Sequence, residues 1–402
     1  MLKKLDFESI LKISLILISI GYVFDEKKLI NTFFFIGLFI QLLRLIKYRY
    51  SFDLNDFKVY YKLIFFMMLF CISITISSFF AVDINLSLKY AEHYFKWMFI
   101  PFFMAIILCF RIDNFQKYIC YGFVISILII NVGIIYNSLA LNFERCGDFF
   151  IKAPNATAGT LIFLYPFILF IDWTKNIYVK YSLLVFTIFT VVLTGSRGAL
   201  AALFCIIFLS LFSKFRKIKL KKIIIFTMIS VSFLLISYNY IDSQKFDRFT
   251  EVIKYHDSLI EHRVGGDRLL LWKSSLNMID DYTLFGVGLK NFNKVYIENN
   301  YINVLAKEPN LQSPHNMFLH FFVETGMIGG ISFIALILYQ VDILKKYISK
   351  YKDEFSNACF LAIIGMCIHG MVDYLFFLKF FYQLYWFVIS ATWFNLMLKK
   401  YN

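Results

Sequence analysis

Residues that could take part in chemistry lie at the ends of apolar segments in this sequence. His315 occurs in Ser313-Pro314-His315-Asn316, directly before an apolar stretch that contains Gly326-Met327-Ile328-Gly329. An imidazole titrates near neutral pH, so it can accept the proton of a hydroxyl group. The same position also suits a structural hydrogen-bond donor at a helix start. Asn316 beside the histidine, and glycines that let helices pack closely, favour a fixed histidine and therefore the catalytic interpretation.

Two arginines are the other strong candidates. Arg197 lies in Thr194-Gly195-Ser196-Arg197-Gly198, a short break between two apolar runs, and Arg268 follows Gly265-Gly266-Asp267 at the start of a predicted helix. A guanidinium near lipid needs water or an anionic partner, and a helix N-terminus attracts phosphate. Arg197 could instead reach lipid phosphates, and Arg268 could pair with a surface acid. The small neighbours of Arg197 leave room for a ligand, and arginine binds phosphate oxygens with two hydrogen bonds.

Four further polar residues have weaker claims. Lys89 and Arg145 each fall in a short predicted loop, where either could simply be solvated. His320 is rotated by about 140° from His315 on a helix, so the two histidines do not form a ready metal pair. Glu324 falls on the opposite face from His315 and is interpreted as a structural partner for another helix. No CxxC pair occurs among the seven cysteines, so neither a disulfide framework nor a zinc site is predicted. No cofactor is expected.

The composition indicates that a membrane protein positions these residues. The chain has 402 residues, of which 60% are hydrophobic and 20% aromatic. Long apolar runs recur along its whole length, whereas the strands of a β-barrel would give short alternating patterns. The first run, Ile10 to Phe24, lacks a small-residue cleavage site and is interpreted as a retained helix rather than a signal peptide. We therefore predict an all-α polytopic membrane protein.

The net charge of +14 is concentrated in short basic stretches between the apolar runs. Residues 214–222 carry six basic and no acidic side chains, and a second group comprises Lys345, Lys346, Lys350 and Lys352. Short basic loops mark the cytoplasmic side of a membrane. The charge therefore indicates the lipid bilayer as a partner, and not nucleic acid.

Twelve spans are predicted, which puts both termini on one side of the membrane. The ends of the chain are basic, so this side is the cytoplasm. Residues 1–239 hold nine spans, 240–316 form a large outer segment, and 317–402 hold three spans. Lys89, Arg145, Arg197 and the outer segment then share the opposite side. The spans are 10–24, 29–46, 62–82, 95–110, 116–139, 157–171, 181–194, 198–213, 223–239, 317–340, 357–372 and 380–398.

The outer segment 240–316 differs from the basic loops in its charge. It holds nine Lys/Arg against ten Asp/Glu and is too long for a simple connector. Leu269, Trp272, Leu276 and Ile279 recur at helical spacing, which predicts an amphipathic helix that lies on the membrane surface or caps the bundle. Arg197, Arg268 and His315 thus face one side of the membrane. Such a set suits a lipid-bound diphosphate as the leaving group and a hydroxyl as the nucleophile.

These residues resemble the O-antigen ligase/polymerase superfamily of bacterial envelope glycosyltransferases. The resemblance rests on His315-Asn316 with Gly326 and Gly329, on Ser196-Arg197-Gly198, and on the run Asp267-Arg268, Trp272, Gly286-Val287-Gly288, Asn291-Phe292. It covers chiefly residues 190–335. It implies a GT-C-like fold in the bacterial inner membrane, with cytoplasmic termini and a helical periplasmic loop between spans nine and ten.

The resemblance also implies the reaction, a metal-independent inverting transfer of a glycan from undecaprenyl diphosphate on the periplasmic face. Arg197 and Arg268 would bind the diphosphate, with Lys89 and Arg145 as further candidates, and His315 would activate the acceptor. Asn316, Gly326 and Gly329 would support the histidine. A chain near 400 residues is most like the ligases, which attach O-antigen to lipid A–core oligosaccharide.

Three alternatives stay open from the sequence. An O-antigen polymerase would use the same reaction with a second lipid-linked glycan as the acceptor. A protein O-oligosaccharyltransferase would be longer and would carry a different C-terminal part. A transporter would show repeated halves and charges at mid-membrane, whereas here no repeat is visible and the candidate charges lie at one face. The glycan, the acceptor hydroxyl and the oligomeric state are not indicated.

Overall fold

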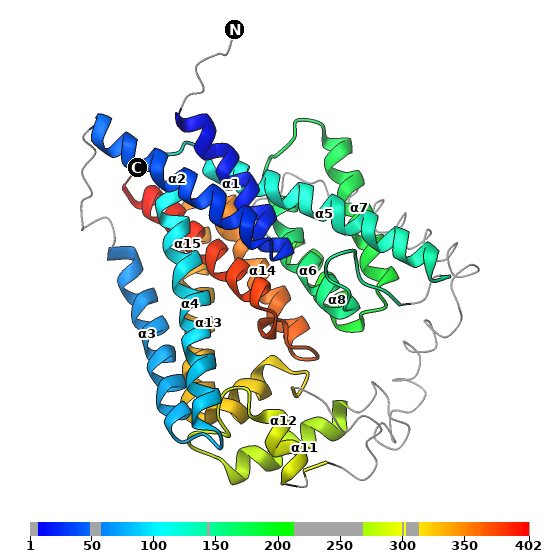
Figure 1. Ribbon diagram of the computed structural model, residues 1–402. Coiled ribbons are helices and arrows are strands. Elements are labelled where there is room, and N and C mark those ends of the chain that lie inside the picture. The colour runs from blue at the N-terminus through cyan, green and yellow to red at the C-terminus, as the bar shows by residue number, and fades with distance from the viewer. Residues whose placement is uncertain are drawn as a thin grey trace.

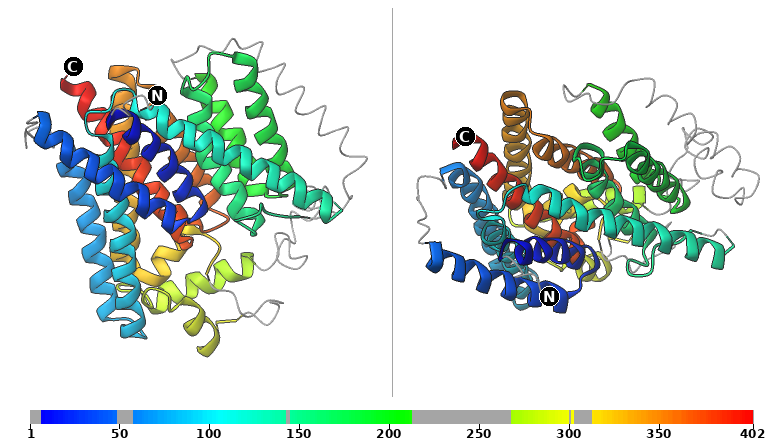
Figure 2. Two further views of the ribbon diagram at one scale, coloured as in Figure 1. Left: turned by 45° about the horizontal axis from the view of Figure 1, so that its top comes forward. Right: turned by 90° about the horizontal axis from the view of Figure 1, so that it is seen from above.

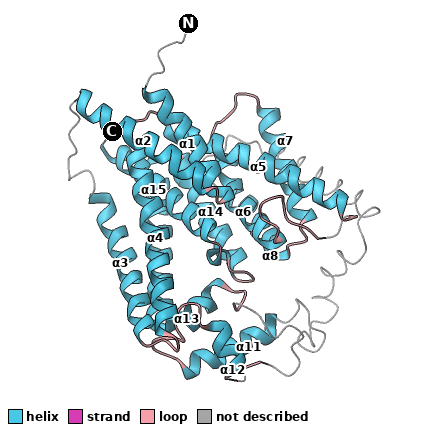
Figure 3. Ribbon diagram, in the orientation of Figure 1, coloured by secondary structure: helices cyan, strands magenta, loops and turns pink. Residues whose placement is uncertain are grey.

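The computed structural model describes residues 7–48, 58–142, 145–212, 268–299, 301–302 and 313–401. Within these ranges the regular structure is helical and contains no strand (Figures 1 and 3). The helices are α1 (Phe7–Phe24), α2 (Lys27–Tyr48), α3 (Lys58–Phe79), α4 (Ile84–Cys109), α5 (Phe115–Ala140), α6 (Pro154–Phe170), α7 (Ile177–Leu193), α8 (Arg197–Phe212), α11 (Arg268–Asp281), α12 (Phe292–Glu298), α13 (Met317–Tyr351), α14 (Glu354–Gly370), the short 3₁₀ helix η2 (Leu375–Phe377) and α15 (Lys379–Tyr401).

The prediction of a polytopic helical membrane protein is confirmed in its coarse form. Every predicted span within the described residues coincides with a helix. The span 223–239, the basic stretch 214–222 and the outer residues 240–267 lie outside those residues. By length and composition, α1 to α5 and α13 could each cross a membrane, while α6, α7, α8 and α14 are shorter apolar helices. The number of twelve crossings stays a prediction.

Two predicted boundaries were wrong. Helix α4 begins at Ile84 and not at 95, because the side chain of Asp83 accepts a hydrogen bond from the N–H of Leu86 and caps the helix there. Lys89 is therefore a helix residue and not a loop residue. Helix α13 continues to Tyr351, so Lys345, Lys346 and Lys350 lie in the helix and Lys352 caps its end. Hydropathy marks the part of a helix that suits lipid, and a charged helical end lies beyond that part.

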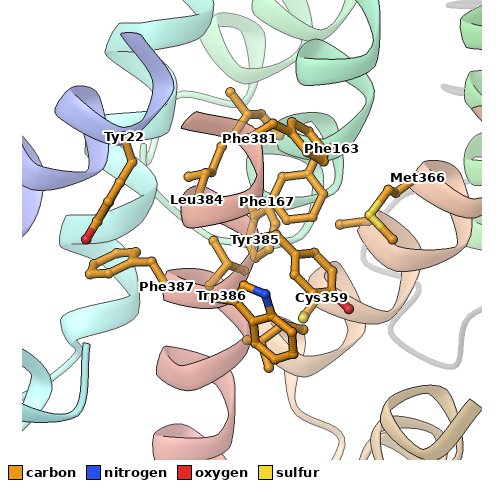
Figure 4. Close-up of a cluster of buried hydrophobic side chains, with 14 of the residues drawn as sticks. Tyr22, Phe163, Phe167, Cys359, Met366, Phe381, Leu384, Tyr385, Trp386 and Phe387 are labelled. Carbon is orange, nitrogen blue, oxygen red and sulfur yellow. The ribbon is translucent and has the colours of Figure 1, made fainter. Parts of the chain in front are cut away.

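The helices pack around a core rich in aromatic side chains. Helix α15 packs on α4, α13 packs on α3, and α14 packs on both α6 and α8. Figure 4 shows part of this core, in which Phe163 of α6 lies beside Phe381 and Tyr385 of α15. Lipid tails are as apolar as these side chains, so close van der Waals packing holds the helices together. This packing fixes α6, α8, α13 and α14, whose ends form the site.

The two ends of the bundle differ. The start of α1 and the end of α15 lie at one end, whereas α11 and α12 lie at the other (Figures 1 and 2). An even number of membrane crossings, such as the predicted twelve, places both termini at the same end of the bundle. The assignment of the α11–α12 end to the outer side remains a prediction.

Helix α13 is interrupted at Gly326, near the α11–α12 end. Gly326 has φ 64° and ψ −169°, a conformation open essentially to glycine alone. The segment 283–288 occupies the break and replaces the missing helical hydrogen bonds. The N–H groups of Val287 and Gly288 donate to the carbonyls of Val323 and Glu324, both at 2.9 Å, and the N–H of Met327 donates to the carbonyl of Thr283 at 2.8 Å. Gly326 therefore makes room for the segment 283–288, whereas its spacing from Gly329 predicted close helix–helix packing.

Replacement of Gly326 by alanine is expected to destabilise the protein by about 3 kcal/mol or more, through a strained backbone and a steric clash. A Cβ at this position would lie 2.2 Å from the carbonyl oxygen of Leu284. Thermal unfolding of the detergent-solubilised protein measures the effect. Ile331→Ala is the matched control, because Ile331 lies on the same helix and is 54% exposed. An unchanged melting temperature for Gly326→Ala would contradict the role of the break.

A small separate core ties α11 and α12 to the first part of α13. Leu271 and Met278 of α11 are buried there with Phe292 and Tyr296 of α12 and Val323 of α13. A helix was predicted correctly here, and it is described over Arg268–Asp281. The face that packs inside the protein is a different one, Leu270, Leu271, Ser274, Ser275 and Met278, and Leu276 of the predicted apolar stripe is 52% exposed.

Candidate active site

The predicted arginines meet in one pocket of about 40 Å³ at the ends of several helices. Arg197 is the first residue of α8, Arg268 lies in α11, and Arg145 follows α5 in the chain. All three line this pocket, which we call the arginine pocket. The remaining lining residues are Asn155, Gly195, Ser196, Gly198, His369, Val372 and Asp373.

A second cavity of about 410 Å³ adjoins the arginine pocket and contains His315. Arg145, Asn155 and Asp373 line both spaces. Apart from these three residues and His315, the lining is mostly apolar, and we call this space the histidine cavity. It is completed by Ala153, Pro154, Ala156, Ser313, Tyr374, Leu375, Phe377 and Leu378. Residues far apart in the sequence thus surround one continuous region.

Local structure fixes Arg145 against the start of α6 and the end of α7. Its Nε donates to the carbonyl of Thr194 at 3.0 Å, and its guanidinium also donates to the side chain of Asn155. Thr194 is followed by Gly195, which has φ 64° and turns the chain from α7 into α8. The turn that begins α8 at Arg197 therefore also anchors Arg145. The guanidinium groups of Arg145 and Arg197 are therefore positioned by the same turn.

Arg268 is held in place by helix α11, in which it lies. One turn further along α11, the indole N–H of Trp272 donates to the carbonyl of Pro314 at 3.0 Å. Pro314 directly precedes His315. One contact thus couples the position of Arg268 to the turn that carries the histidine.

His315 lies in a strained turn and contacts a carboxylate. Its φ of 48° is left-handed, which is rare for a residue with a side chain and is typical of functional sites. Its Nδ1 lies 3.4 Å from Oδ1 of Asp373. Asn316 begins α13, because its side-chain oxygen accepts from the N–H groups of Phe318 and Leu319. The Asn316 amide also donates to the carbonyl of Met371 at 2.9 Å and so joins α13 to the end of α14.

Asp373 was not predicted as a site residue from the sequence. Burial alone would raise the pKa of Asp373, but the hydrogen bond with His315 and the electrostatic interactions with the two histidines lower that pKa to about 2. The side chain is therefore a carboxylate at neutral pH. A carboxylate on Nδ1 holds the histidine in the tautomer whose Nε2 can accept a proton. The sequence contained a signal, because an aspartate directly after an apolar span is as costly near lipid as the histidine.

Lys290 lies near the site, whereas Lys89 was the lysine predicted to bind the diphosphate. Lys89 is exposed on α4 and lines neither space. The ammonium of Lys290 lies 3.7 Å from the ring centre of Phe377, a residue of the histidine cavity. Burial lowers the pKa of Lys290, against the opposing charge of Glu324. Lys290 has φ 65° and lies just after the segment 283–288 that occupies the break in α13, a conformation that residue spacing does not reveal.

Glu324 pairs with a histidine of its own helix, which corrects the expected partner on another helix. Its Oε2 lies 3.1 Å from Nε2 of His320, and both side chains are buried. The His320 ring stacks on Tyr374 at 3.8 Å between ring centres. This pair lies behind the histidine cavity, where Tyr374 forms a wall. Gly329 faces the side chain of Thr325 within α13 and contacts no site residue among its nearest neighbours.

Fold and site together define a polytopic helical membrane protein with an arginine-lined pocket beside a histidine–aspartate pair. Residues 182–334 match the profile of the family described as O-antigen ligase. Its members are membrane glycosyltransferase-like enzymes of the ligase and polymerase type. The match includes Arg197, Arg268 and His315, whereas Arg145 and Asp373 lie outside it.

A relative from Haemophilus influenzae extends the similarity beyond the matched segment. That protein, described as uncharacterised, is 24% identical over 344 residues, which cover 81% of this chain and 82% of the relative. The similarity therefore covers most of both proteins, but it assigns no substrate.

Proposed function

We propose that this protein is an O-antigen ligase that transfers a glycan from undecaprenyl diphosphate to lipid A–core oligosaccharide on the periplasmic face of the inner membrane. One observation carries the proposal: the arginine pocket and the histidine cavity adjoin and share Arg145, Asn155 and Asp373. A donor diphosphate and an acceptor hydroxyl need two such spaces around one reacting carbon. The family match supports the ligase and polymerase type of reaction.

The arginine pocket suits the diphosphate of the donor. Three guanidinium groups line it, two from helices α8 and α11 and one from the loop after α5, and each can bind phosphate oxygens with charge-assisted hydrogen bonds. Backbone N–H groups at the start of α8 add to the positive potential. Negative charge grows on the leaving phosphate oxygen as the sugar–phosphate bond breaks. Fixed cations beside that oxygen lower the barrier, because they need no rearrangement during the reaction.

The histidine cavity suits the acceptor sugar. In the proposed step, the acceptor hydroxyl oxygen attacks the anomeric carbon from the face opposite the diphosphate, and a new glycosidic bond forms. The bond between that carbon and the phosphate oxygen breaks, and its electron pair leaves with undecaprenyl diphosphate. The hydroxyl proton moves to Nε2 of His315, while Asp373 stabilises the resulting imidazolium through Nδ1. Attack from the opposite face inverts the anomeric configuration.

Asp373→Asn is expected to lower the turnover number by about 10- to 100-fold, because an amide no longer fixes the tautomer of His315. Asp373→Glu, which keeps the negative charge, is expected to retain more activity than the amide. Turnover is measured with purified protein, lipid-linked glycan and lipid A–core. An Asp373→Asn protein with wild-type turnover would remove the aspartate from the mechanism.

A deletion strain distinguishes the ligase from the polymerase. Loss of a ligase leaves bare lipid A–core and accumulated lipid-linked polymer, whereas loss of a polymerase leaves core with one repeat unit. We expect the first result. In vitro transfer by the purified protein without ATP would in turn exclude a transporter.

A further inference from the structure

His369 is a buried polar side chain that the proposed mechanism does not yet use. It lies on α14, one helical turn before Asp373, and is 1% exposed. Among the described residues, neither ring nitrogen has a hydrogen-bond partner. A buried imidazole without partners costs about 1–3 kcal/mol, so such groups in folded proteins call for an explanation. Because His369 lines the arginine pocket, a ligand there could supply the partner.

Two glycines on neighbouring helices make room for the imidazole. A Cβ added to Gly159 of α6 would lie 3.1 Å from Cε1 of His369, and one added to Gly198 of α8 would lie 3.8 Å from Cδ2. Closer contacts at these glycines involve Leu375 and Val372, so α14 and the turn after it fit tightly against both helices. The ring is therefore held in place at the boundary between the protein core and the pocket.

The charges around the arginine pocket indicate which ligand would meet the ring. Arg145, Arg197 and Arg268 are cationic, and the one carboxylate among the lining residues, Asp373, is engaged by His315. Such a pocket attracts an anion with several oxygen atoms. A neutral imidazole has one N–H donor, which such an oxygen can accept.

We propose that His369 binds the diphosphate of the glycan donor through a hydrogen bond from its ring N–H to a phosphate oxygen. This inference rests on the proposed function. No proton is transferred from His369 in this role. The hydrogen bond strengthens as negative charge moves onto the leaving phosphate, in the same sense as the contacts from the arginines. The diphosphate would thus have a donor at the buried side of the pocket in addition to the guanidinium groups.

The test measures the binding of geranylgeranyl diphosphate, a short prenyl diphosphate, to the purified full-length protein by native mass spectrometry. His369→Leu removes the donor with little change in volume and is expected to weaken binding by about 10- to 100-fold. His369→Gln keeps an N–H donor and is expected to bind within a few-fold of wild type. A histidine that serves packing alone predicts the reverse order, or equal affinities, and either outcome would overturn the proposal.

Two further arms separate this inference from the proposed function. Arg197→Ala and Arg268→Ala are measured with the same ligand. If both arginine variants lose affinity and His369→Leu does not, only the assignment of His369 fails. If none of the three variants loses affinity, the donor site itself is misplaced. Should His369→Leu fail to fold, a cryo-EM structure of the wild-type complex decides the question: a ring nitrogen within about 3.2 Å of a phosphate oxygen supports the proposal, and a ring without that contact overturns it.

Discussion

His315→Ala is expected to lower the turnover of glycan transfer by about 10²–10⁴-fold while donor binding stays nearly unchanged. This is the usual contribution of a general base, and the imidazole is the group that would take the acceptor proton. The donor is held in the arginine pocket, which His315 does not line. Turnover is followed with purified protein, lipid-linked glycan and lipid A–core, and binding is measured separately with a prenyl diphosphate.

His93→Ala is the matched control for this prediction. His93 lies on α4, stacks on Trp97 and lines neither space. We expect its replacement to leave turnover near the wild-type value. Near-normal activity of folded His315→Ala would exclude the histidine as the base.

Arg197→Ala and Arg268→Ala are each expected to weaken both donor binding and turnover, by about 30- to 1,000-fold. Removal of a guanidinium leaves the bound diphosphate with fewer charge-assisted hydrogen bonds in the ground state and in the transition state alike. Lysine at either position should restore only part of the activity, because an ammonium keeps the charge but lacks the planar pair of donors. The measurements are the dissociation constant for a prenyl diphosphate and the turnover number.

Arg111→Ala serves as the control for loss of a positive charge. Arg111 is exposed in the turn between α4 and α5 and is not among the residues that line the site. Its loss should change neither quantity. Unchanged donor affinity in both Arg197→Ala and Arg268→Ala would show that the diphosphate binds elsewhere.

The helical layout was largely predictable because lipid imposes a simple rule on sequence. A helix that crosses a membrane must be apolar over most of its length, and the predicted spans in the described residues coincide with helices. Boundaries were less predictable where helices leave the apolar region. Helix α4 begins eleven residues before the predicted start at 95, because its cap at Asp83 and not its hydropathy sets the end.

The site was predictable in part. Charged and titratable groups at membrane boundaries are costly, so their presence drew attention to Arg197, Arg268 and His315, and these residues lie around two adjoining spaces. The same argument applied to His369 and Asp373 would have predicted a polar pair one helical turn apart. Both were overlooked because they stand at the end of an apolar run that was interpreted only as a span.

Backbone geometry could not be predicted from residue spacing. Two glycines three residues apart in an apolar run usually indicate helix packing, whereas Gly326 takes a φ of 64° that interrupts α13. The partner of that break, the segment 283–288, is about forty residues away in the sequence. Likewise the apolar stripe of α11 does not reveal the face that packs inside the protein, because Ser274 and Ser275 are buried there.

A cryo-EM structure with bound undecaprenyl diphosphate tests the central claim most directly. The account predicts the diphosphate between Arg197, Arg268 and Arg145, next to the cavity that holds His315, with its phosphate oxygens within about 3.2 Å of guanidinium nitrogens. A diphosphate bound outside the arginine pocket, or at the end of the bundle where α1 begins, would contradict it.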